Sequence, residues 1–115
     1  MSVFWQKKKK SGIKILSREK SDYNDIYVIQ NGATREMWFR KKNDFFLQSR
    51  INIYEPNTLV LIYSKMMIAA LLLQPVPSSI LMIGLGGCAV SNFLARLYPR
   101  AVIDVVEVDR KVIDI

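Results

Sequence analysis

The chain has 115 residues, half of them apolar and 23% charged, a composition typical of a folded globular protein and not of a disordered one. This length is enough for one ordinary domain or for parts of two, and it is too short for a complete doubly wound α/β enzyme. A single cysteine and no histidine exclude a disulfide framework and argue against a metal site. These counts favour a reducing, cytoplasmic setting.

The net charge of +7 comes entirely from residues 1–50, led by the basic run Lys7–Lys10. Such a run can attract nucleic acid or anionic lipid, but no mixed aromatic and basic pattern of a nucleic-acid module follows it. We interpret residues 1–12 as a disordered basic N-terminus, and we expect neither nucleic acid nor a membrane as a partner. Nucleic-acid binding through residues 1–20 is the least favoured alternative.

Residues 13–55 predict a small antiparallel β-domain. The segments that alternate or are rich in β-formers are 13–17, 25–30, 34–40 and 45–53. Asn31-Gly32 separates two of these segments and is a strong hairpin signal. We expect a meander of about three to five strands, in which the last segment forms one strand or a strand pair.

Residues 56–79 predict a connecting helix followed by a linker. The apolar run 59–73 is shorter than the roughly 20 residues that a membrane-spanning helix needs, and we interpret it as a buried helix. The apolar residues that recur in it at helical spacing are Leu61, Met66, Ala69, Ala70 and Leu73. Pro75 and Pro77 cannot continue a helix, and they mark a domain boundary.

Residues 80–115 change to an α/β pattern. The continuously apolar run 80–83 is typical of a parallel strand that is covered on both faces. A glycine-rich turn, a helical stretch at 90–97 and a second strand at 101–108 follow it, and Asp109 is placed to cap the next helix. We predict that the two strands are parallel and adjacent.

The glycine-rich turn carries the candidate binding residues Gly84, Gly86 and Gly87. Gly84 lets the chain leave the strand in a tight turn, and the other two glycines let the backbone approach a ligand without a Cβ in the way. Glu107 ends the second strand, where a carboxylate can accept hydrogen bonds from both ribose hydroxyls. A tight turn without a ligand, with Glu107 merely solvated, is the alternative interpretation.

Two further residues of the turn narrow the chemistry. Ala89 occupies the sixth position of the glycine pattern. Residues 80–115 also include no second βαβ half that could hold a nicotinamide. The pattern therefore favours S-adenosylmethionine enzymes over dinucleotide enzymes. Cys88 stands at the start of the helix, but no histidine is present to activate its thiol, and we assign it no catalytic role.

The α/β segment resembles the spermidine synthase family of polyamine aminopropyltransferases. The most characteristic part is 106–109 (VEVD) followed by Val112-Ile113. The upstream segments that are similar to family elements, in the same order, are 21–26 (SDYNDI, for S-x-Y-Q-x-I), 47–49 (LQS) and 63–75 (the connecting helix). The resemblance extends over about residues 13–115.

The resemblance implies a fold and a reaction. The fold is a small N-terminal antiparallel β-domain followed by a class I S-adenosylmethionine-dependent methyltransferase (Rossmann-like) sheet, of which residues 80–115 would form the first βαβ unit. In the reaction, a diamine nitrogen attacks the aminopropyl carbon of decarboxylated S-adenosylmethionine. The implied ligands are decarboxylated S-adenosylmethionine, S-adenosylmethionine or methylthioadenosine, without a metal, and the β-domain would support a homo-oligomer.

Residue by residue the resemblance is incomplete. Glu107 matches the family's ribose-binding glutamate, but Gly87 stands where its G-G-G-D-G-G turn has an aspartate. Asn24 replaces a cofactor-contacting glutamine, and Ser64 replaces a histidine of the connecting helix. The family's catalytic aspartate lies on a later strand that these residues do not include.

We therefore expect a spermidine synthase-like protein that lacks the catalytic half and is inactive alone. Two alternatives stay open. One is a non-catalytic, self-associating interaction fragment, and the other is an S-adenosylmethionine-dependent methyltransferase-like protein.

Overall fold

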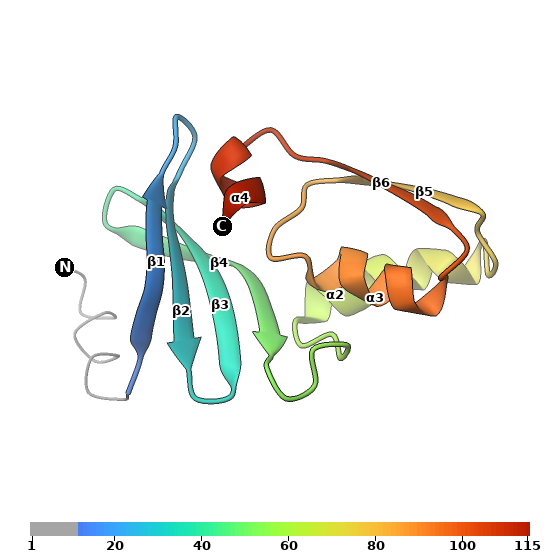
Figure 1. The fold of residues 1–115 in the computed structure, drawn as a ribbon, viewed down its shortest axis with the longest axis horizontal. Coiled ribbons are helices and arrows are strands. Elements are labelled where there is room, and N and C mark those ends of the chain that lie inside the picture. Colours follow the sequence, from blue (N-terminus) through green and yellow to red (C-terminus); the bar gives the residue numbers. More distant parts are fainter. Residues whose placement is uncertain (1–11) are drawn as a thin grey trace.

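The computed structural model describes residues 12–115, which form an antiparallel sheet beside a smaller α/β unit (Figure 1). The basic run Lys7–Lys10, like nearly all of the predicted disordered N-terminus, lies outside the described residues. The strands of the first sheet are β1 (Lys14–Lys20), β2 (Asp25–Asn31), β3 (Thr34–Lys41) and β4 (Asp44–Asn52). They pair antiparallel in the order β1-β2-β3-β4, which confirms the predicted meander.

Two-residue turns join β2 to β3 and β3 to β4. Asn31 pairs with Thr34, so the first turn is Gly32-Ala33, one residue later than the Asn-Gly signal indicates. Gly32 has a φ of 57°, a left-handed conformation that glycine adopts without steric cost. In the second turn Lys42 takes a φ of 55°, and β4 then continues as a single strand and not as a strand pair.

The first sheet carries an apolar cluster on each face, because successive side chains of a strand point to opposite sides. The buried residues of one cluster are Tyr27, Ile29 and Trp38. On the opposite face, Ile26 and Met37 pack against Val112 of α4 (Arg110–Asp114). The second cluster therefore joins the β-domain to the α/β unit.

The connecting segment forms α2 (Ile62–Ile68) and the short 3-10 helix η1 (Ala69–Leu72). The predicted buried stripe is wrong apart from Leu61, since Met66 is 69% exposed and Leu73 is 89% exposed. The other residues that turn inward, none of them in the predicted stripe, are Ser64, Ile68 and Leu71. The segment is apolar nearly all round, so its sequence does not reveal which side will be covered.

The α/β unit contains β5 (Ser79–Ile83), α3 (Ala89–Leu97) and β6 (Val102–Val106), followed by α4. The strands β5 and β6 are adjacent and parallel, with Met82 opposite Val105. This confirms the predicted strand–turn–helix–strand order. None of the helices in residues 12–115 is long and apolar enough to cross a membrane.

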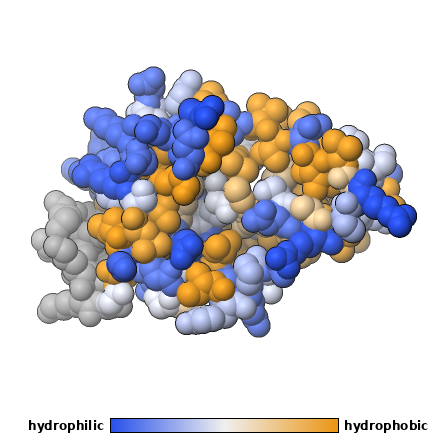
Figure 2. Space-filling model, in the orientation of Figure 1, coloured by the Kyte–Doolittle hydropathy of each residue, from blue (hydrophilic) through white to orange (hydrophobic). Residues whose placement is uncertain are grey.

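Within the described residues, only one face of the β5–β6 pair is covered. Met82 is buried beneath α2, η1 and α3 in a third apolar cluster. The opposite side, which we call the outer face, carries Leu81, Ile83, Val102, Val106 and Val108, all more than half exposed, together with one exposed charged residue, Asp104. Figure 2 shows apolar side chains gathered over β5 and β6. Parallel strands normally bury both faces, so the outer face is an uncovered apolar surface.

Candidate functional site

The turn between β5 and α3, residues 84–88, crosses to the end of the neighbouring strand. The N–H of Gly84 donates to the carbonyl of Val106 at 2.7 Å, and Gly84 takes a φ of 93°. Gly86 has a φ of 55°. Cys88, the N-cap of α3, has a φ of 61°, which costs a non-glycine residue about 1 kcal/mol or more.

Glu107 follows β6, and its carboxylate ties the two strand ends together. Oε2 accepts a hydrogen bond from the N–H of Leu85 at 2.9 Å, and Oε1 accepts one from the N–H of Asp109 at 2.9 Å. Each oxygen can accept a further hydrogen bond from a ligand hydroxyl. The structure thus brings the predicted residues Gly84 and Glu107 together at the carboxyl ends of parallel strands, where open α/β sheets bind ligands.

Gly87 lies against β4 and cannot carry a side chain there. A Cβ added to Gly87 would lie 2.6 Å from Oγ of Ser49 and 2.9 Å from its Cβ, closer than real contacts allow. A carboxylate at this position is therefore excluded while Ser49 stays in place. Ser49 is 4% exposed, and its hydroxyl has no hydrogen-bond partner among residues 12–115.

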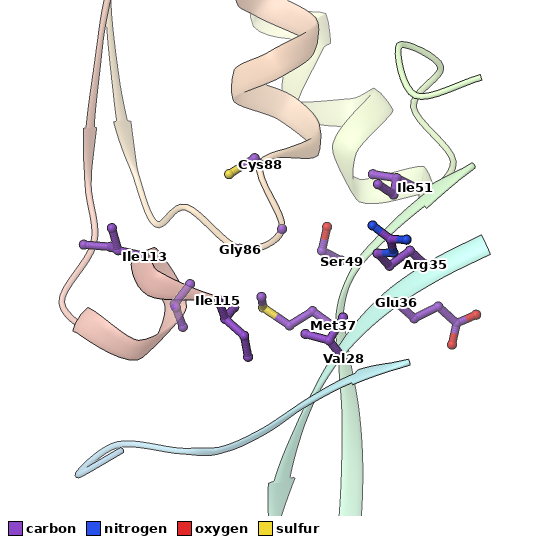
Figure 3. A pocket seen from close by; sticks show the side chains of 12 residues that line it. Val28, Arg35, Glu36, Met37, Ser49, Ile51, Gly86, Cys88, Ile113 and Ile115 are labelled. Atoms are coloured by element: carbon purple, nitrogen blue, oxygen red, sulfur yellow. The ribbon is translucent and has the colours of Figure 1, made fainter. Parts of the chain in front are cut away.

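Two cavities meet at the turn, and Ser49, Gly86 and Gly87 line both. The turn cavity, about 280 Å³, lies between the turn, β4 and α2. On its wall the hydroxyl of Tyr63 donates to the carbonyl of Gln48, which fixes α2 against β4. The sheet cavity, about 230 Å³, lies between the turn, the β-domain sheet and α4 (Figure 3).

The sheet cavity is apolar apart from a few polar groups. Its apolar walls include Met37 of β3 and Val112 of α4. Arg35 also lines it, is exposed, and forms no ion pair with any described residue. Glu36 borders the cavity, but its carboxylate points away in Figure 3 and accepts hydrogen bonds from Trp38 and from Arg50.

Asp109 connects the α/β unit to the β-domain, a role that the sequence did not suggest. Its side chain is the predicted N-cap of α4 and accepts from the N–H of Lys111 at 3.0 Å. It also accepts from Oγ of Ser21 at 2.5 Å and from Nδ2 of Asn24 at 3.3 Å. Burial acts to raise the pKa of Asp109, but the hydrogen bonds from Ser21, Asn24 and the backbone outweigh it and hold that pKa below its usual value.

The remaining sequence candidates lie apart from the cavities. Asn24, at the family's glutamine position, donates its side-chain N–H to the carboxylate of Asp109. Ser64, at the family's histidine position, is buried inside α2 and lines neither cavity. The residues that sequence reasoning missed, Arg35 and Ser49, sit on separate strands of the β-domain, and only the register of β3 and β4 brings them to the turn. Residues 12–115 contain no group of three acidic, histidine or cysteine side chains that could hold a metal.

Comparison with known proteins gives consistent matches. The chain is 36% identical over 96 residues to a polyamine aminopropyltransferase of Vibrio vulnificus, covering 83% of this chain and 32% of that protein. It is 38% identical over 89 residues to a polyamine aminopropyltransferase of Chromobacterium violaceum, covering 77% of this chain and 33% of that protein. The chain thus spans about a third of the length of these curated relatives. No protein-family model matches it.

A solved structure shares the fold. The crystal structure of a probable spermidine synthase from Corynebacterium glutamicum superposes with a TM-score of 0.68 at 20% identity, covering 88% of this chain and 38% of that one. The sequence matches and this shared fold agree with each other. The chain therefore belongs to the spermidine synthase-like family and corresponds to an N-terminal portion of its members.

Proposed function

We propose that residues 80–109 form the adenosine-binding part of an aminopropyltransferase-like site, built on the first βαβ unit of a Rossmann-like sheet. The observation that carries this proposal is the Glu107 carboxylate, held at the ends of both strands by the N–H groups of Leu85 and Asp109. A carboxylate fixed in this way is positioned to accept hydrogen bonds from a ribose diol. Decarboxylated S-adenosylmethionine, S-adenosylmethionine and methylthioadenosine all contain that diol.

Methylthioadenosine is the simplest probe of this proposal. Isothermal titration calorimetry of the 115-residue chain should give saturable 1:1 binding. Glu107→Gln should weaken it about tenfold, because a hydrogen bond to a charged carboxylate contributes more than one to a neutral amide. Glu55→Gln, in an exposed loop far along the chain from the turn, is the matched control and should bind like the unchanged chain. Absence of binding by the unchanged chain would contradict the proposal.

Aminopropyl transfer needs more than this binding site. The acceptor nitrogen forms a bond to the aminopropyl carbon, the carbon–sulfur bond breaks with its electron pair moving to sulfur, and the amine loses a proton. The two carboxylates beside the turn have other roles: Glu107 accepts from backbone N–H groups and keeps its remaining acceptor capacity for a ribose diol, and Asp109 accepts from Ser21, Asn24 and the N–H of Lys111. We infer that these residues bind the nucleoside and do not catalyse aminopropyl transfer.

That inference has a direct assay. The 115-residue chain, incubated with putrescine and decarboxylated S-adenosylmethionine, should form no spermidine above a buffer control. Catalytic turnover would show that a carboxylate among these residues accepts the proton.

The outer face supports a second function, self-association. It exposes Leu81, Ile83 and Val106 on a parallel sheet, a surface that in other proteins is covered. Contact with a second copy through this face would bury it. The role of an interaction segment therefore stands beside nucleoside binding. The outer face and the turn cavity share Ile83, whereas the other outer-face residues line neither cavity.

A further inference from the structure

The groups where the two cavities meet are hydrogen-bond donors. Within residues 12–115, the N–H groups of Gly86 and Gly87 donate to no protein acceptor, and they directly precede the N-terminus of α3. A helix N-terminus with free N–H groups attracts negative charge. By itself this arrangement occurs in many turns without a ligand.

Ser49 is the independent observation that points to a ligand. Its hydroxyl is buried, has no partner among the described residues, and faces Gly87 across the closest approach of β4 to the turn. Figure 3 shows this hydroxyl directed toward the turn. A buried hydroxyl without a hydrogen bond is costly and uncommon, so an acceptor supplied by a bound molecule would complete the site.

The charges around Ser49 indicate whether the bound molecule that supplies this acceptor is negatively charged. Arg35 lines the sheet cavity and forms no ion pair with a described residue. The carboxylate of Glu36 lies on the other side of the strand, where Arg50 neutralises it at 2.9 Å. Gly87 cannot become acidic, because any side chain would collide with Ser49. The side chains around the cavity therefore offer donors and a positive charge, and none of them is a free carboxylate that would bind an ammonium group.

We propose that this junction binds a carboxylate, so that the ligand of the site is an adenosine derivative whose 5′ side chain ends in a carboxylate, as in S-adenosylmethionine, and not the decarboxylated form. The carboxylate accepts from the Ser49 hydroxyl and the free N–H groups of the turn, with Arg35 supplying the opposite charge. This proposal rests on the proposed adenosine site and specifies the far end of its ligand.

S-adenosylhomocysteine and methylthioadenosine test it, because both contain the adenosine and thioether and only the first carries the carboxylate. Calorimetry on the 115-residue chain should find that S-adenosylhomocysteine binds at least about tenfold more tightly than methylthioadenosine. Ser49→Ala and Arg35→Gln should each reduce that advantage several-fold and leave methylthioadenosine affinity unchanged. Arg96→Gln, the same change on the exposed last turn of α3, should leave both affinities unchanged.

The outcomes separate the two levels of the proposal. If methylthioadenosine binds as tightly as S-adenosylhomocysteine, the adenosine site stands and the carboxylate subsite is refuted. If neither compound binds, the proposed function fails and the subsite fails with it. An advantage for S-adenosylhomocysteine that survives Ser49→Ala and Arg35→Gln in folded variants would place the carboxylate elsewhere and overturn the assignment.

Discussion

Asp109 offers the sharpest test of how the two parts of the chain hold together. Asp109→Ala removes the N-cap of α4, which typically stabilises by about 1 kcal/mol. It also removes a 2.5 Å charged hydrogen bond from Ser21, of the kind that contributes about 1.5–3 kcal/mol, and a longer one from Asn24. Ser21 retains its own contact with the carbonyl of Asn24, so we expect a total loss of about 3 kcal/mol.

Thermal unfolding followed by circular dichroism measures this loss. For a chain of this size, about 3 kcal/mol corresponds to a fall in Tm of roughly 10–20 °C. The matched control is Asp114→Ala, which removes an exposed i,i+4 pair with Arg110 and should cost less than about 0.5 kcal/mol. If the two alanine variants lose equal stability, the connection between Ser21, Asn24 and Asp109 does not hold the domains together.

The same carboxylate predicts an acid dependence. Because the pKa of Asp109 is lower in the folded chain, its contribution is fully present above the unfolded pKa near 3.9 and is lost as the pH falls through the lower, folded pKa. The difference in unfolding free energy between the unchanged chain and Asp109→Asn should therefore shrink from pH 7 to pH 3. Asp25, whose pKa is lowered by its hydrogen bond from Arg18, keeps some acid sensitivity in both proteins. A difference that is constant across this range would contradict the assignment.

Two further substitutions test the turn and the outer face. Gly87→Ala should lower the free energy of unfolding by about 1–3 kcal/mol, because the added methyl group overpacks against Ser49. In a double-mutant cycle measured by urea unfolding, adding Ser49→Gly should restore part of this loss. Additive losses would exclude the contact between Gly87 and Ser49. We expect the unchanged chain to associate at micromolar concentration, and Val106→Lys on the outer face should reduce its mass in light scattering, while Val76→Lys in the proline-rich loop should not. A monodisperse monomer unaffected by Val106→Lys would refute the self-association proposal.

The elements of this fold were predictable where a local pattern determines them. Alternation and the Asn-Gly signal predicted the strands and the hairpin of the β-meander, although the signal placed the turn one residue too early and so did not give the register. The glycine turn between two short apolar runs predicted the parallel β5–β6 pair. The helix of the connecting segment was predictable only as a helix, since its covered side depends on the position of α3 and not on its own residues.

The candidate site was predictable only in its α/β half. Gly84, Gly86 and Glu107 belong to one continuous strand–turn–helix–strand pattern, so their spacing could place them together. Ser49 and Arg35 come from the β-domain, and their sequence neighbourhoods contain no ligand signal. Their position beside Gly87 depends on how the two parts dock, which is a long-range packing outcome. The sequence pattern likewise showed Asp109 as a cap and could not show its distant partners.

The hydrogen bond between Ser21 and Asp109 joins residues 88 positions apart, and this separation bears on the order of folding. Every strand pair of the meander joins strands that are neighbours in sequence, whereas α3 separates β5 from β6. The contact between Asp109 and Ser21 closes a loop that includes nearly the whole described chain. Long loops close late because their entropy must be offset before distant contacts stabilise anything. The meander should therefore form first and serve as the template on which the turn between β5 and α3 is completed, and synthesis from the N-terminus makes this template before the turn.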